Sequence, residues 1–340
     1  MQDISAPSPI YLSSFPSLGI FSRTARNYLQ TPKKMAQDTY TNAGLTPKKV
    51  SFASGSEHVV AHLYLPEDYS PSKRYPALVL GGPLSTVKEQ VSGNYASQMA
   101  RRGFIALAVD FRNYGESGGA KRQHEDPESK SQDLSAALEF LAVRSDVSGT
   151  GLLGICTTGG NVLYTAARDS RAMAVATVVG AFFEPSLALS LLGPELSRQR
   201  LSEAAGAREL YDTTGEIECI RAYHDSDKAA LNISEYFDYY LNQGRGGGVS
   251  AWRNAFAVMS HEAWQAFDPV SHAASVTAPT LVIHSEYAAF PDQARKAHSL
   301  LGGKKELKFL QGTHFDFYDQ TDKVNEVADL LAEHFHRTLQ

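Results

Sequence analysis

Short apolar runs rich in β-branched residues alternate with longer segments of helical periodicity from Lys49 to the C-terminus. This alternation is typical of a mostly parallel sheet with helices on both faces. The runs predict eight strands, over Lys49–Ala53, Ala61–Leu65, Ala77–Leu80, Ile105–Asp110, Gly151–Ile155, Val175–Val179, Leu281–His284 and Leu307–Leu310. Apolar residues at spacings of three and four predict helices over Val87–Arg102, Gln132–Val143, Gly160–Arg168, Pro291–Leu301 and Asp322–His336. The pattern therefore predicts an α/β core.

The alternation is interrupted between Glu184 and Asp268, where no strand is predicted. Aromatic residues are frequent in this segment, which also contains the glycine-rich stretch Gly244–Gly248. We expect a helical lid, residues 184–268, inserted after the sixth strand, so that the core consists of residues 45–183 and 269–340. Residues 1–44 are rich in Ser and Pro and contain several basic residues. They predict an amphipathic arm packed on the core, with a targeting segment as the alternative.

The composition, 43% hydrophobic and 20% charged over 340 residues, is that of a globular protein. The formal net charge is -5 and no dense cluster of Lys and Arg occurs, which argues against a nucleic-acid partner. Cys156 and Cys219 are too few for a disulfide framework or a cysteine-built zinc site, which fits a reducing compartment. No segment has the roughly 18 consecutive apolar residues of a membrane span. We expect a cytoplasmic protein without metal or cofactor, or an organellar one if residues 1–44 are a targeting segment.

A candidate nucleophile, Cys156, lies where a buried strand is followed at once by a helix, within Gly154–Gly160. The small residues around it permit the strained strand-to-helix turn known as a nucleophile elbow. The start of the helix places its positive end beside the sulfur and favours a thiolate, and the Thr157 N–H can stabilise an oxyanion. An isolated cysteine is more often buried and inert, but this turn favours a catalytic role.

A thiol nucleophile works best with a nearby base, and His314 is the histidine best placed to supply it. It follows the last predicted strand in the segment Gly312–Tyr318, at the carboxyl end of the sheet, where sites of α/β proteins assemble. His284, at the end of the preceding strand, and His261, in the lid, are expected to have structural roles.

The third member of a triad is expected between Cys156 and His314 in the chain. Glu286 lies in the loop after the seventh predicted strand and is the preferred acid. Asp292, farther along the same loop, and Glu184, after the sixth strand, remain alternatives.

The second oxyanion donor is expected in the loop Gly81–Leu84 after the third predicted strand, where two glycines allow the backbone to approach the elbow. The Leu84 N–H is the candidate, because Pro83 has no N–H to donate. The polar turn Asp110–Gly119 is expected to support the site.

The lid contains a group of aromatic residues, most of which should pack against the core. A few should bind an apolar acyl group, and we expect this of Tyr240, Trp252, Phe256 and Trp264. Tyr236, Phe237, Tyr239 and Phe267 belong to the same group.

Taken together, several motifs resemble those of dienelactone-hydrolase-like α/β hydrolases, and more narrowly those of the fungal polyketide transferase family. The motifs are Gly81–Gln90, Asp110–Gly119, Gly154–Gly160, Asn254–Ser260, His284–Asp292 and Gly312–Asp319. The resemblance begins near Lys48 and implies an α/β-hydrolase fold that performs acyl transfer or hydrolysis without a cofactor, often on a polyketide chain in secondary metabolism. It also implies that cysteine replaces serine as nucleophile, with Cys156 and His314 at matching positions. Ala288 stands where the acid is common and Thr158 where the elbow commonly has glycine.

Three functions compete. The first is an acyltransferase or thioesterase-type hydrolase that forms a thioester on Cys156, with an apolar acyl substrate that a polyketide synthase carrier domain would deliver. The second is a cyclase that uses His314 as a base while Cys156 is passive. The third is a hydrolase-fold binding protein without turnover, for which Ala288 is the main argument. The sequence leaves the acyl acceptor and the oligomeric state open.

Overall fold

The structure is a computed structural model that describes residues 45–224, 229–231 and 237–339. The N-terminal arm, residues 1–44, and Tyr236 of the lid lie outside the described residues. Among the described residues, no helix combines the length and the hydrophobicity that a membrane span requires.

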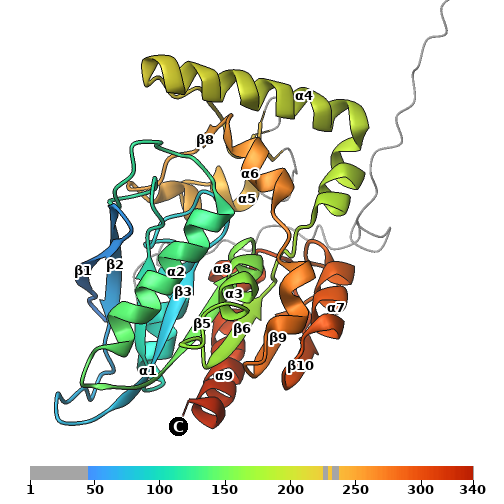
Figure 1. The fold of residues 1–340 in the computed structure, drawn as a ribbon. Helices are drawn as coiled ribbons and strands as arrows, with labels where there is room; N and C mark the ends of the chain where they lie inside the picture. Colours follow the sequence, from blue (N-terminus) through green and yellow to red (C-terminus); the bar gives the residue numbers. More distant parts are fainter. Residues whose placement is uncertain (1–44, 225–228, 232–236, 340) are drawn as a thin grey trace, which may run out of the picture. The chain divides into compact units, whose positions relative to one another are not determined.

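An eight-stranded sheet forms the centre of the core (Figure 1). Across the sheet the strands follow the order β1 (Lys48–Ser54), β2 (Glu57–Tyr64), β4 (Ile105–Val109), β3 (Tyr75–Gly81), β5 (Val147–Ile155), β6 (Ala174–Val178), β9 (Thr280–His284) and β10 (Lys305–Phe309). Strand β2 pairs antiparallel with β1 and with β4, and all other pairs are parallel. The predicted eight-stranded, mostly parallel sheet is confirmed, with every strand within a few residues of its predicted bounds.

Helices cover both faces of the sheet. Alternate residues of strand β3 demonstrate this, because they pack against different helices. Leu78 and Leu80 of β3 belong to a core cluster with α1 (Val91–Arg101) and α9 (Thr321–Thr338). Ala77 and Val79 of the same strand belong to a second cluster with α2 (Pro127–Ala142), α3 (Thr158–Ala166) and α7 (Pro291–Leu300). Because successive side chains of a strand point to opposite faces, the sheet is buried on both sides.

The segment between β6 and η4 (Val270–Ser275) contains the expected helices, and it also contains strands. Its elements are α4 (Pro185–Thr214), β7 (Cys219–Ile220), α5 (Phe237–Tyr240), η3 (Gly246–Gly248), β8 (Phe256–Ala257) and α6 (Ser260–Ala266). Helix α4 bends at Gly193, where φ is 75°, just before Pro194. The antiparallel pair of β7 and β8 was not predicted, because two residues per strand are too few to show an alternation. Helix α6 packs on α4 (Figure 1).

Candidate active site

The turn from β5 into α3 carries Cys156, which has a φ of 53°. This backbone conformation is costly for a residue other than glycine and places the side chain at the end of the strand. The turn has no room for a side chain at two of its glycines. A Cβ on Gly154 would lie 2.4 Å from the Thr158 carbonyl oxygen, and one on Gly159 would lie 2.8 Å from the Gly180 Cα. The structure therefore has the strained turn that the sequence predicted around Cys156.

The Cys156 thiol is buried, with 6% of the residue exposed. Burial raises the pKa of the thiol to about 11, although hydrogen bonds from the Tyr318 hydroxyl and the Thr157 N–H lower it. The sequence favoured a thiolate because of the adjoining helix, but the loss of solvation is the larger effect here. Cys156 is therefore a neutral thiol at neutral pH.

His314 lies in the loop between β10 and the short helix α8 (Asp316–Asp319) and is also buried. Its Nδ1 accepts a hydrogen bond from the Ala289 N–H at 3.4 Å. Its Nε2 lies 3.0 Å from the Tyr318 hydroxyl. Burial, with a smaller effect from the nearby His284, lowers the pKa of His314 to about 3. The imidazole is therefore neutral at neutral pH.

The three candidate acids are each engaged with a basic side chain. Glu286 and Asp292 accept hydrogen bonds from Arg295, and the Glu286 side chain is 52% exposed. Glu184 accepts two hydrogen bonds from Lys296, at 2.6 and 2.8 Å. The contacts of Glu286 thus do not support its assignment as the acid. Ala288 is buried in the same loop, and the N–H of the following residue is the group that reaches His314.

The loop after β3 lies against the elbow. The Thr158 hydroxyl donates to the Gly82 carbonyl oxygen at 2.5 Å, and a Cβ on Gly81 would lie 2.4 Å from the Thr158 methyl carbon. Thr158 therefore occupies the space that Gly81 leaves, and its hydrogen bond to Gly82 joins the loop to the elbow. In the same loop the Ser85 N–H donates to Glu125 at 3.3 Å. The Leu84 N–H remains the predicted second oxyanion donor beside Thr157.

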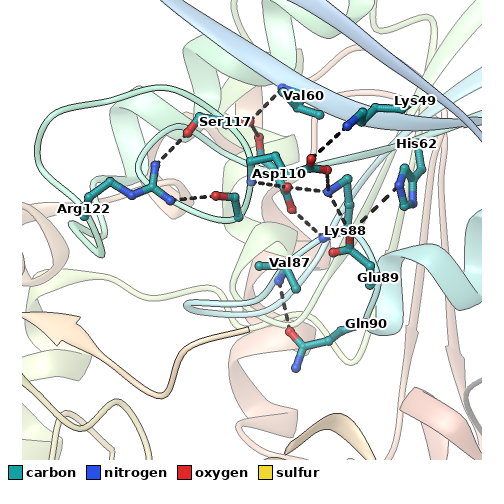
Figure 2. Close-up of polar contacts among 12 residues, drawn as sticks. Lys49, Val60, His62, Val87, Lys88, Glu89, Gln90, Asp110, Ser117 and Arg122 are labelled. Carbon is teal, nitrogen blue, oxygen red and sulfur yellow. Dashed lines mark hydrogen bonds and ion pairs between the residues drawn. The ribbon is translucent and has the colours of Figure 1, made fainter. Parts of the chain in front are cut away.

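The far end of this loop is held by a buried ion pair (Figure 2). Lys88 donates to Asp110 from its N–H at 2.7 Å and from Nζ at 2.8 Å, and neither side chain is exposed. Nζ also lies 2.7 Å from Glu89 and 2.9 Å from Glu116. The turn after β4 is thereby attached to the loop after β3.

Three residues beside this ion pair, His62, Glu89 and Glu116, are close enough together to hold a cation. The Lys88 ammonium contacts both carboxylates, so a positive charge already lies against this group.

A pocket beside the elbow is formed by α6, the segment after β6, the first turns of α3 and the start of α2. It is lined by Glu125, Pro127, Thr157, Asn161, Ala181, Phe183, Trp264 and Phe267. The rings of Trp264 and Phe183 lie 4.6 Å apart. The structure thus places Trp264, one of the four aromatic residues expected to bind substrate, in a pocket that reaches Thr157.

The other three aromatic residues have different surroundings. The Trp252 indole N–H donates to the Ser85 carbonyl oxygen at 3.0 Å. Tyr240 stacks on Tyr223 with ring centroids 3.7 Å apart, and Phe256 lies against His261.

Sequence reasoning missed two groups next to His314: the Tyr318 hydroxyl and the Ala289 N–H. Tyr318 had only a weak signal in the sequence, its position four residues after His314, because His314 lies in the loop before α8 and the two residues do not share a helix. A backbone N–H has no such signal, because its direction depends on the path of the loop.

Comparisons with known proteins identify the family and the fold. Residues 55–191 match the family model described as X-Pro dipeptidyl-peptidase (S15 family). The uncharacterized protein PA2218 of Pseudomonas aeruginosa is 32% identical over 318 residues, 86% of this chain and 82% of PA2218. Its crystal structure matches with a TM-score of 0.76 over 90% of this chain and 99% of that chain. The chain belongs to the α/β-hydrolase superfamily.

The predicted α/β-hydrolase fold is thereby confirmed. The structure of the α/β hydrolase GrgF from a Penicillium species, 19% identical, has the same fold, with a TM-score of 0.75 over 87% of this chain and 99% of that chain.

Two fungal proteins are more distant relatives of the present chain, because each matches less than half of it. The thiohydrolase aneE of Aspergillus aculeatus is 36% identical over 105 residues, 30% of this chain and 33% of that protein. The acyltransferase drtE of Aspergillus calidoustus is 27% identical over 175 residues, 48% of this chain and 57% of that protein.

Proposed function

We propose that this α/β hydrolase is an acyltransferase or thioesterase-type hydrolase that forms a thioester on Cys156. The observation that carries the proposal is the position of Cys156: its thiol is at a strained elbow, next to the Thr157 N–H and to a Tyr318 hydroxyl that contacts His314. An inert buried cysteine needs neither the positive φ nor a tyrosine–histidine pair beside its sulfur.

In the proposed reaction the sulfur attacks the carbonyl carbon of an ester or thioester, the bond from that carbon to the leaving oxygen or sulfur breaks, and the thiol proton passes to the leaving group. The N–H groups of Thr157 and Leu84 stabilise the oxyanion. Water, an alcohol or an amine then accepts the acyl group and restores the thiol.

The proposed substrate carries an apolar acyl group, of the kind found on polyketide chains in secondary metabolism. Support comes from the pocket beside Thr157, where Phe183, Trp264 and Phe267 supply apolar surface. The thiohydrolase and acyltransferase names of the two fungal relatives agree with thioester chemistry. Delivery by a carrier domain of a polyketide synthase remains a prediction.

Intact-mass analysis of the protein after exposure to a panel of acyl thioesters and activated esters tests this proposal. We expect one acyl adduct per chain, on Cys156. We expect that Cys156→Ala loses the adduct and at least about 1000-fold in kcat/KM while keeping its melting temperature, because alanine fits the same turn. Cys219→Ala is the matched control, since Cys219 is exposed, and it should keep both adduct and turnover.

Turnover of Cys156→Ala at the wild-type rate would contradict the covalent mechanism. Together with loss of turnover in His314→Ala, it would favour the cyclase. A protein that shows neither an adduct nor turnover on any substrate would favour the binding protein.

A further inference from the structure

We propose that Tyr318 is a catalytic residue of this site, which carries the proton between Cys156 and the substrate while His314 positions its hydroxyl. The inference rests on the proposed function and assigns its proton transfer to a residue that the sequence did not single out.

The contacts place the Tyr318 hydroxyl between the other two groups. Its oxygen lies 3.0 Å from His314 Nε2, and the hydroxyl is close enough to the Cys156 sulfur to lower the pKa of the thiol. Tyr318 is fully buried, so bulk water does not compete for these contacts. The Tyr318 hydroxyl therefore links His314 to the reacting sulfur.

Helix α8 is held so that the hydroxyl stays in this position. The Tyr95 hydroxyl of α1 donates to the Phe317 carbonyl oxygen at 2.8 Å, and the Asn94 side chain donates to that of Tyr318 at 3.2 Å. On the lid side, Arg245 forms a 2.7 Å ion pair with the buried Asp319. A tyrosine held from both sides is preorganised for proton transfer.

The Ala289 N–H determines which way the hydrogen bonds run. Because it donates to His314 Nδ1, this nitrogen carries the lone pair, and the proton of the neutral imidazole is on Nε2. Nε2–H then donates to the Tyr318 oxygen, and the Tyr318 O–H donates to the sulfur. A carboxylate at Nδ1 would select the opposite tautomer, the one in which Nε2 acts as a base.

The protons balance as follows. In acylation the Tyr318 O–H turns from the sulfur to the leaving atom, and the Tyr318 oxygen then accepts from Sγ–H. The Sγ–H bond breaks and its proton moves to this oxygen as the bond from Sγ to the carbonyl carbon forms. The original hydroxyl proton moves to the leaving sulfur or oxygen as its bond to that carbon breaks. In deacylation a proton of the acceptor moves to Tyr318, and the Tyr318 proton returns to Sγ. Neither an imidazolium nor a free thiolate is required, which agrees with the lowered pKa of His314 and the raised pKa of Cys156.

The test compares Tyr318→Phe with Tyr95→Phe, which removes an equally buried hydroxyl bonded to the same short helix. The readout is the rate of Cys156 acylation by alkyl thioesters and by aryl thioesters, followed by intact mass. We expect Tyr318→Phe to slow acylation by alkyl thioesters about 100-fold. The loss should be smaller with aryl thioesters, whose leaving group needs no proton, but it should remain measurable because Tyr318 also accepts the Sγ proton. Tyr95→Phe, which loses a contact that only positions α8, should slow acylation by both classes of thioester to the same and smaller extent.

A second pair of variants separates a positioning histidine from a base. His314→Gln keeps an N–H that can donate to Tyr318 but cannot accept the proton, whereas His314→Ala keeps neither function. We expect His314→Gln to be at least about tenfold more active than His314→Ala.

Equal activity of His314→Gln and His314→Ala, or wild-type acylation of Tyr318→Phe with alkyl thioesters, would overturn the inference. The proposed function would survive that result as long as the wild-type protein forms the Cys156 adduct. If the wild-type protein forms no adduct, it is the proposed function that fails.

Discussion

Cys156 and His314 show how burial decides the charge of a reactive side chain. A helix N-terminus contributes about 0.3–1 kcal/mol to an adjacent negative charge, which is less than one pKa unit. The pKa of the Cys156 thiol is nevertheless raised, to about 11, because a buried thiolate loses its solvation. The local motif thus identifies the residue, and its surroundings determine its protonation state.

The acid of the proposed triad can be tested by single substitutions. We expect Glu286→Gln to reduce kcat/KM less than about threefold, because the carboxylate pairs with Arg295 at the surface, where such pairs contribute about 0–1 kcal/mol. Asp292→Asn and Glu184→Gln serve as comparisons in the same kinetic assay. A loss of 100-fold or more in Glu286→Gln alone would restore Glu286 as the acid.

The short helix α8 and the lid helix α6 contribute to the site from different parts of the chain. Helix α8 brings Tyr318 to His314 and Cys156, and α6 brings Trp264 to the pocket beside Thr157. Both elements are short, and their positions depend on contacts with the core.

Trp264 is expected to make the enzyme selective for long acyl groups. Each methylene buried against the pocket contributes about 0.8 kcal/mol, or roughly fourfold in affinity. We expect kcat/KM to rise from acetyl to octanoyl thioesters, and Trp264→Ala to reduce this rise while still accepting acetyl.

Trp264→Phe is the matched variant, because it keeps an aromatic ring beside Phe183 and should retain most of the dependence on length. Equal kcat/KM values for acetyl and octanoyl thioesters in the wild-type protein would remove the main support for an apolar acyl substrate.

Across the whole molecule, several histidines are buried in neutral form. Burial lowers the pKa of His261 to about 4 and that of His314 to about 3, and it also lowers the pKa of His284 and His334. In the unfolded chain these side chains titrate near pH 6.5. Below that pH the unfolded chain therefore binds more protons than the folded protein.

The protein should consequently lose stability as the pH falls from about 6.5 to 5. His261 and His314 should each contribute a loss of about 1.4 kcal/mol per pH unit in this window, because the unfolded chain is protonated there and the folded state is not. Chemical unfolding at constant ionic strength measures the slope, and His261→Leu should make it shallower. A free energy of unfolding that stays constant from pH 7 to 5 would contradict this prediction.

The pattern of apolar residues determined the eight strands and the helices that cover them, because each core element is long enough to show its period. The elbow was equally visible, since a buried strand, small residues and a helix follow one another in the chain. The strands β7 and β8 were not visible, because each is two residues long.

Only the tertiary structure decided the partners of the reactive groups. Glu286, Asp292 and Glu184 were equally consistent with the chain order, and the fold directs all three to Arg295 or Lys296. It brings Tyr318 between Cys156 and His314, and it aims the Ala289 N–H at the imidazole. The physical reason is that periodicity and local spacing are properties of neighbouring residues, whereas burial, backbone direction and contacts between distant segments exist only after the chain has folded.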